Sequence, residues 1–395
     1  MAATKKVTKK DEPPKLSPSE KALAKFMTDA EKSYGKGKFQ LGAVPEQYEV
    51  ISTGSIMLDQ ALVVGGYVKG RTVEIWGPEG SGKSTLAMHG CAEAQKDDPN
   101  KIVMYIDMEH RFDKQWAISH GMDLKRTLLV QPENAEEVAD MVKDACRSGL
   151  FSMVVVDSVA SMIPEVEKVK DAGDAVMGKQ AQIVTRMVKI CAVEADRTKT
   201  VVIFINQVRA NLGYGGDVTT GGGFALKHGT TMKFAIRRTA KGALKIGGDT
   251  SQQIGHLVTV NVERNSVALA YRKAEFAILY VSTEKFGPMG FDTAMEATDL
   301  GIEMGIIGVE GSWYTNKVTG EKVQGKPAML ELIRAQPAVC QEIRSRCIEM
   351  LRSDVIANTV VVHDDDEPGA VILSFDTDDG NPDGVTLPNL LRGDS

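Results

Sequence analysis

Ten consecutive residues have the types and spacing of a phosphate-binding loop. The run Trp76-Gly-Pro-Glu-Gly-Ser-Gly-Lys-Ser-Thr85 fills all four fixed positions of the pattern G-x-x-x-x-G-K-[ST]. Glycines let successive backbone N–H groups turn toward a polyphosphate, while the lysine reaches its terminal phosphates and the serine hydroxyl binds Mg²⁺. The pattern predicts nucleoside triphosphate binding, against the alternative of an ordinary glycine-rich turn. The residues expected to hold the nucleotide are Gly77, Pro78, Glu79, Gly80, Ser81, Gly82, Lys83, Ser84 and Thr85.

Polar residues at the ends of three further strand-like runs complete a candidate catalytic set. Asp157 ends the run Met153–Asp157 and is expected, with Ser84, to hold Mg²⁺; the alternative is a carboxylate that caps a loop. Glu109, two residues after Asp107, could orient and deprotonate water for attack on the γ-phosphate, unless it is merely solvated. Gln207 follows the run Val201–Asn206, where its amide could contact the γ-phosphate.

The elements around these residues predict a parallel sheet covered by helices. Residues 71–76 alternate like a strand, and Lys83 to Gln95 has a helical pattern whose N-terminus favours an anion. Strands that alternate with helices at this spacing form parallel sheets, in which the carboxyl ends converge on the ligand. The four expected parallel strands are 72–76, 102–107, 153–157 and 201–206. Three runs with few helices between them, 231–237, 257–263 and 275–281, predict an antiparallel extension at one edge.

Length and composition indicate one large domain and smaller parts. With 395 residues, 43% hydrophobic and 25% charged, the chain is an ordinary globular one, and no apolar run is long enough to span a bilayer. Its five cysteines are scattered without a C-x-x-C, which argues against zinc and disulfides and for the cytoplasm. The expected divisions are a disordered basic tail (1–17), a helix and linker (18–45), the nucleotide-binding core (46–285), a small α+β domain (286–353) and an acidic tail (354–395). Within the small domain, the sequence predicts a hairpin around Gly320 in residues 312–323 and two short helices, split at Pro337, in residues 327–351.

The net charge of −6 is unevenly distributed. From Asp364 to the C-terminus the chain carries nine carboxylates and one arginine, so the remainder is slightly basic. The acidic tail is either a solubilising segment or a regulatory one. The segment 208–224 is glycine-rich, and its backbone N–H groups could clasp a phosphodiester. The alternative for that segment is an idle linker.

The chain resembles the bacterial-type RecA recombinases over residues 21–351. The resemblance rests on a set of short motifs: Ile51-Ser-Thr-Gly-Ser55, the phosphate loop, Asp107-Met-Glu-His110, Met177-Gly178, Phe204-Ile-Asn-Gln207, Thr219-Thr-Gly-Gly222 and Ala274-Glu-Phe276. It implies an α/β fold with a RecA-type ATPase core, and an ATP- and Mg²⁺-dependent DNA recombinase. Such a protein forms filaments on single-stranded DNA, pairs it with homologous duplex DNA and serves DNA repair and the SOS response, with an SOS-type repressor as a further partner and no membrane.

The resemblance also implies roles for individual residues. Lys83, Glu109, Gln207 and Arg264 would be catalytic, with Arg264 reaching the nucleotide of a neighbouring protomer, and Asp113 and Trp116 would lie beside the adenine. The DNA-binding residues it implies are Met177, Gly178, Arg186, Lys189, Arg209, Tyr214, Gly221, Gly222 and Gly223. The N-terminal helix would pack on the adjacent protomer.

The chain also departs from the family pattern. The glycine-rich segment 208–224 corresponds to the family's second DNA loop and is shorter than usual. Phe224, His228 and Gln182 replace an asparagine, an aromatic residue and an arginine. Ser266 stands where the family has a second lysine after the strand that ends at Glu263, so one of two cations is missing. Two alternatives follow: a RecA-type ATPase that assembles without exchanging strands, or a ring-forming DNA motor.

Overall fold

A computed structural model describes residues 18–35, 48–166, 178–209, 219–220, 226, 229–246 and 252–359. The chain divides into two compact units, one ending at Gln47 and one beginning at Tyr48. The described residues do not include the predicted tail 1–17, residues 360–395 of the predicted acidic tail 354–395, or most of three predicted segments: the linker, the first DNA loop (171–179) and the second DNA loop (208–224).

The first unit contains helix α1, Pro18–Tyr34, where the sequence predicts a helix. The helix ends where Gly35, at φ 97°, turns the chain and donates its N–H to the carbonyl of Glu31 at 2.9 Å. Glycine adopts this left-handed conformation without a steric penalty, so it is a common residue just past a helix end.

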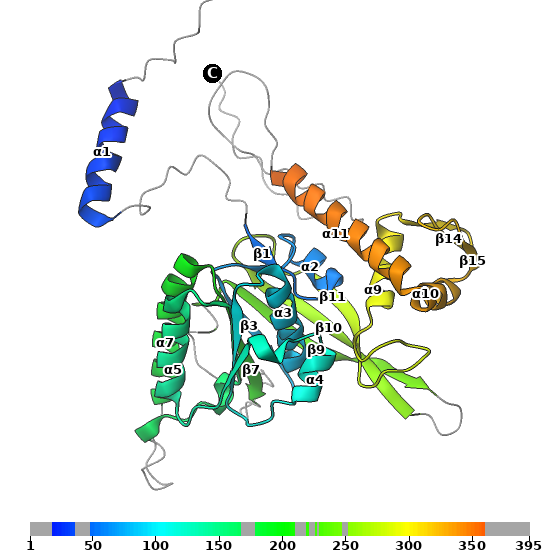
Figure 1. Cartoon of the computed structure of the whole chain (residues 1–395), viewed down its shortest axis with the longest axis horizontal. Coiled ribbons are helices and arrows are strands. Elements are labelled where there is room, and N and C mark those ends of the chain that lie inside the picture. The colour runs from blue at the N-terminus through cyan, green and yellow to red at the C-terminus, as the bar shows by residue number, and fades with distance from the viewer. Residues whose placement is uncertain are drawn as a thin grey trace, which may run out of the picture. The chain divides into compact units, whose positions relative to one another are not determined.

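The second unit is organised around a ten-stranded sheet with the order β12-β11-β10-β9-β3-β7-β6-β4-β5, in which β8 pairs with β7 (Figure 1). The predicted parallel strands are confirmed as β3 (Thr72–Gly77), β4 (Ile102–Asp107), β6 (Phe151–Asp157) and β7 (Val201–Arg209). The edge strand β5 (Thr127–Val130) was not expected, and β7 extends three residues beyond the predicted end to pair with β8 (Thr219–Thr220).

The predicted antiparallel extension is also present. It consists of β9 (Met232–Ile246), β10 (Gln252–Asn265), β11 (Lys273–Leu279) and β12 (Gly290–Phe291). Strand β9 pairs with β3 in parallel and with β10 antiparallel, so it joins the two parts of the sheet. The predicted fold class, an α/β core with a mostly parallel helix-covered sheet, is therefore confirmed.

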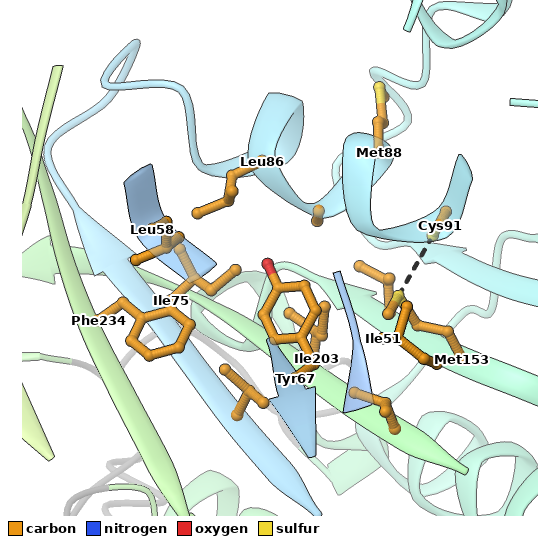
Figure 2. Packing of buried hydrophobic residues seen from close by; sticks show 14 of the residues in the cluster. Ile51, Leu58, Tyr67, Ile75, Leu86, Met88, Cys91, Met153, Ile203 and Phe234 are labelled. Carbon is orange, nitrogen blue, oxygen red and sulfur yellow. Dashed lines mark hydrogen bonds between the residues drawn. The ribbon is translucent and has the colours of Figure 1, made fainter. Parts of the chain in front are cut away.

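Helices cover both faces of the parallel part, each over its own apolar layer. Helices α2 (Ile56–Ala61), α3 (Lys83–Asp97) and α4 (Lys114–Ser119) lie on one side, and α5 (Ala135–Ser148) and α7 (Lys179–Thr198) on the other (Figure 1). Figure 2 shows the first layer, in which Tyr67 of β2 (Tyr67–Val68), the partner of β1 (Val50–Ile51), packs among Ile75, Leu86 and Phe234. The strand predicted at residues 71–76 is confirmed as β3, and every residue of it is buried because it is a central strand with helices on both faces.

The last part of the second unit has its own apolar cluster. This part of the unit comprises α9 (Thr293–Glu303), a three-stranded antiparallel sheet, α10 (Lys326–Ala335) and α11 (Pro337–Thr359). The predicted hairpin around Gly320 is confirmed as β14 (Trp313–Asn316) and β15 (Lys322–Gln324), and β13 (Ile307–Glu310) is an addition. Helix α11 is 23 residues long rather than short, and it continues past the predicted boundary at residue 353. No helix of the described residues is long and apolar enough to cross a membrane.

Candidate nucleotide-binding and catalytic site

The sheet register brings the predicted site residues to one edge. Gly77 at the end of β3 pairs with Gln207 of β7, and Asp107 at the end of β4 pairs with Asp157 of β6. Because these strands are parallel and adjacent, their carboxyl ends form a single edge, from which the phosphate loop and helix α3 emerge. This is the edge at which ligands bind in open α/β sheets.

The phosphate loop is held in a shape that depends on its glycines. A Cβ on Gly77 would lie 2.1 Å from the carbonyl oxygen of Ile236 in β9, so only glycine fits there. Gly82 has φ 99° and begins helix α3, so the loop enters the helix through a left-handed residue. The Lys83 ammonium donates to the carbonyl oxygens of Gly77 and Pro78 at 3.1 and 2.8 Å. Burial lowers the pKa of Lys83, and nearby carboxylates oppose this shift.

Beside the loop, a hydroxyl and a carboxylate form a ligand pair suited to Mg²⁺. The Ser84 hydroxyl donates to Asp157 Oδ2 at 2.7 Å, and the Tyr105 hydroxyl donates to the same oxygen at 2.6 Å. Burial raises the pKa of Asp157, while these two hydrogen bonds favour its charged form. Mg²⁺ prefers hard oxygen ligands and takes only one or two from protein when phosphates supply others. The donor set therefore fits this ion.

Glu109 is fixed by three hydrogen bonds to one of its oxygens. Oε1 accepts from the side-chain amide of Gln207 at 2.5 Å, from Ser158 at 2.7 Å and from Ser161 at 3.1 Å. The second oxygen, Oε2, lies 3.6 Å from the Arg111 guanidinium. The carboxylate is thus held with Oε2 directed away from its anchoring donors.

The loop that carries Glu109 is itself anchored by the carboxylate of Asp107. This buried group accepts the backbone N–H groups of Arg111 and Phe112 at 3.2 and 3.0 Å and the amide of Gln131 at 3.1 Å. Arg111 then reaches the phosphate loop, where its guanidinium lies 3.2 Å from Glu79. The Glu109 loop and the phosphate loop are therefore tied together.

The two residues predicted beside the adenine lie at the start of helix α4. Asp113 is its N-cap and accepts the backbone N–H groups of Gln115 and Trp116 at 2.8 and 3.0 Å. The Trp116 indole N–H lies 3.3 Å from the hydroxyl of Thr85 in α3. The structure thus brings Trp116 to the helix that follows the phosphate loop.

Several residues of the site were missed by the sequence analysis. Tyr105, Ser158 and Ser161 flank the predicted acids, and their positions beside strand ends are a local signal that could have identified them. Arg238 of β9 donates its Nε to the carbonyl oxygen of Gly80 at 2.7 Å, but it lies 158 residues further along the chain. No local motif marks such a contact, because it depends on strand order.

Arg264 does not join the site within one chain. It is in register with Lys233 of β9, which is in register with Glu74, three residues before Gly77 in β3. Arg264 is therefore level with the middle of β3 and not with its carboxyl end, from which the phosphate loop emerges. A role at the phosphates would require a second copy of the chain, as the sequence-based expectation states.

The predicted DNA-binding residues are described only in part. Gly178 is the N-cap of α7, and Arg186 and Lys189 are exposed on that helix. Arg209 ends β7, where its backbone pairs with Thr219. The remaining predicted contacts lie outside the described residues: Met177, Tyr214, Gly221, Gly222 and Gly223.

Comparison with known proteins gives a consistent result. A family model described as the RecA N-terminal domain matches residues 21–284. The chain is 38% identical over 348 residues to Protein RecA of Thermotoga neapolitana, covering 86% of this chain and 94% of that protein. It is 40% identical over 335 residues to Protein RecA of Bacteroides thetaiotaomicron, covering 84% and 97%. For Protein RecA of Chlorobaculum tepidum the identity is 36% over 353 residues, covering 88% and 98%.

Proposed function

Because the chain belongs to the RecA family, we propose that it is a DNA recombinase that hydrolyses ATP while assembled as a filament on single-stranded DNA. The filament pairs the bound strand with a homologous duplex and exchanges strands. The observation that carries the proposal is the hydrogen bond from the Gln207 amide to Glu109. This bond joins the proposed catalytic carboxylate to the strand that leads into the second DNA loop. The cytoplasm is the proposed location, and a repressor of the SOS type is a proposed further partner.

ATP is held by the phosphate loop and the start of helix α3. Backbone N–H groups and the helix N-terminus favour the polyphosphate. Lys83 exchanges its two carbonyl contacts for phosphate oxygens, and Trp116 and Asp113 bound the base. Ser84 and Asp157 would hold Mg²⁺, which neutralises phosphate charge when bound.

Hydrolysis requires a base that is ionised and correctly directed. Three donors on Oε1 keep Glu109 in one orientation, so Oε2 can accept a proton from an attacking water. The side chain of Arg111 is 70% exposed and its guanidinium lies 3.6 Å from Oε2, so a polyphosphate can draw it away from Oε2 at small cost. Because the Gln207 side chain donates a hydrogen bond to Glu109, a displacement of the end of β7 also moves the Glu109 carboxylate.

DNA binding is assigned to the two glycine-containing loops and to α7. Positive charge for the DNA phosphates comes from Arg186, Lys189 and Arg209, and Tyr214 offers a ring on which a base can stack. Backbone N–H groups of the glycine-rich loops contact the phosphodiester backbone of the DNA. Arg264 acts on the nucleotide of the adjacent protomer, where its planar guanidinium binds phosphate oxygens in place of the usual lysines. The N-terminal helix α1 packs on that neighbour.

Three measurements test the proposal together. ATP turnover should rise on addition of single-stranded DNA, electron micrographs should show helical filaments, and a labelled strand should be exchanged into a homologous duplex. Turnover with filaments but without strand exchange would favour an assembly ATPase instead. Closed rings in place of filaments would favour a DNA motor and contradict the recombinase.

A further inference from the structure

A buried ionic group interrupts the central strand of the sheet. In β3 the Glu74 carboxylate is fully buried, with 0% exposure. Its partners come from the strands on either side: the amide of Asn206 in β7 donates to Oε1 at 2.9 Å, and the ammonium of Lys233 in β9 lies 3.5 Å from Oε2. Burial raises the pKa of Glu74, and Lys233 and Asn206 oppose that shift. A buried charge is costly, and an apolar residue at this position would avoid the cost.

On one side, Glu74 is linked to the catalytic carboxylate. Asn206 accepts the backbone N–H of Gln207 at 3.0 Å through its side-chain oxygen, while its amide nitrogen is held by Glu74. The Gln207 side chain in turn donates to Glu109. Asn206 is fully buried, so these hydrogen bonds are shielded from water. The position of Gln207 at the end of β7 thus depends on Glu74.

On the other side, Glu74 is linked through Lys233 to β10. Lys233 lies 3.7 Å from Glu263, which also accepts the indole N–H of Trp76 at 2.9 Å. The Lys233 ammonium lies 5.2 Å from the centre of the Trp76 ring. Trp76 directly precedes Gly77, the first glycine of the phosphate loop, in the sequence. A β-bulge between Val262 and Arg264 allows both Glu263 and Arg264 to lie opposite Lys233.

These links place Glu74 between the two ends of one predicted DNA loop. Strand β7 ends at Arg209 and β9 begins at Met232, and the segment between them includes β8, which pairs with β7. The residues between them carry the predicted second DNA loop. Because β7 and β9 flank β3, both ends of this segment are tied to the same carboxylate, through Asn206 and through Lys233.

We propose that Glu74 is a positioning residue that couples the ends of this loop to Glu109 through Asn206 and Gln207. The proposal rests on the proposed function, since it takes single-stranded DNA as the ligand of the loop. A shift of Lys233 at the start of β9 changes its ion pair with Glu74. The change in this ion pair in turn alters the hydrogen bond that Glu74 accepts from Asn206. Buried polar networks of this kind have few alternative arrangements, so they transmit small shifts between packed strands.

The test is a double variant, Glu74→Gln with Lys233→Met, which removes both charges together. Lys233→Met alone leaves the buried Glu74 charge without its cation, and Glu74→Gln alone leaves Lys233 with Glu263 as its remaining carboxylate. Each single change should lower the thermal stability, whereas the double variant should recover most of it. The rate of ATP turnover is measured with and without single-stranded oligonucleotide. We expect the ratio of the two kcat values to fall about tenfold in the double variant, a typical coupling between sites, with KM for ATP changed less than about twofold.

The matched control is Glu296→Gln, which alters another fully buried carboxylate, paired with Arg344 at 2.9 Å. It should lose stability and keep the stimulation ratio. If the double variant is stimulated by DNA as strongly as the unmodified protein, the coupling role of Glu74 is overturned while the proposed function stands. If the unmodified protein is not stimulated by DNA at all, the proposed function fails, and the coupling fails with it.

Discussion

One buried carboxyl group should make the stability of this protein depend on pH near neutrality. Asp59 lies in α2 and is 5% exposed. It accepts hydrogen bonds from the Ser52 hydroxyl at 2.5 Å, from the Thr53 backbone N–H at 2.8 Å and from the Thr53 hydroxyl at 2.7 Å. These donors favour the carboxylate, but burial outweighs them and raises the pKa of Asp59 from 3.8 to about 7.

The sign of the effect follows from proton binding. Between pH 4 and 7 the folded protein holds a proton on Asp59 that the unfolded chain has lost, so folding becomes less favourable as the pH rises. The stabilisation is fully present below the unfolded pKa of 3.8 and is lost as the pH passes the folded pKa of about 7. The whole shift corresponds to about 4 kcal/mol, at 1.36 kcal/mol per pKa unit, and about 2.5 kcal/mol of it is lost between pH 5 and 8.

The prediction is checked by urea unfolding of the protein and of Asp59→Asn at pH 5 and pH 8. Asparagine does not titrate, so the variant should lose less stability than the unmodified protein over this interval, by about 2.5 kcal/mol. Other groups titrate equally in both proteins and cancel in the comparison. The exposed Asp144→Asn is the control and should keep the original pH dependence. Equal slopes for Asp59→Asn and the unmodified protein would refute the reasoning.

Three further predictions concern the site. Glu109→Gln should bind ATP with unchanged affinity but hydrolyse it about 10² to 10⁴ times more slowly, because it keeps the shape of the base and loses its charge; an unchanged kcat would move the base elsewhere. Gly77→Ala should lower both the melting temperature and nucleotide affinity, because its Cβ would lie 2.1 Å from the carbonyl oxygen of Ile236; an unaltered melting curve and affinity would contradict this. Arg264→Ala and Lys83→Ala should each lack DNA-dependent turnover, and mixing them should restore a part of it at interfaces that contain one intact residue of each kind. Mixed filaments without any recovered turnover would place Arg264 outside the site.

The sequence predicted well those features that are set by neighbouring residues. The phosphate loop and helix α3 follow from local turn chemistry and helix pattern, and the strands that end at Asp107 and Asp157 follow from buried apolar runs. The small domain was predicted with its hairpin, because Gly320, at φ 81°, marks the turn. The family motif at residues 51–55 was recognised by its pattern, but its physical role was not apparent.

The structure supplies that role. Ser55 caps α2 by accepting the backbone N–H of Leu58 and also donates to Glu296 of α9, while the carbonyl of Gly54 accepts from Arg344 of α11. The motif is thus a contact between the core and the last helices of the second unit. Its partners lie more than 200 residues away in the chain, so no local pattern could have predicted them.

The same physical reason explains why the sequence could not reveal the role of Glu74. The sequence predicts that residues 71–76 form a strand, but it does not identify the partners of the acid within that strand. The neighbours of a strand depend on the order of strands in the sheet, which no local pattern shows. Once β7 and β9 are known to flank β3, the acid must find partners within the sheet, and only Asn206 and Lys233 meet it there among the residues that the structure describes. A functional motif formed by neighbouring residues, such as the phosphate loop, can therefore be predicted from a sequence like this one. Coupling between residues on neighbouring strands can be inferred only when the order and register of the strands are known.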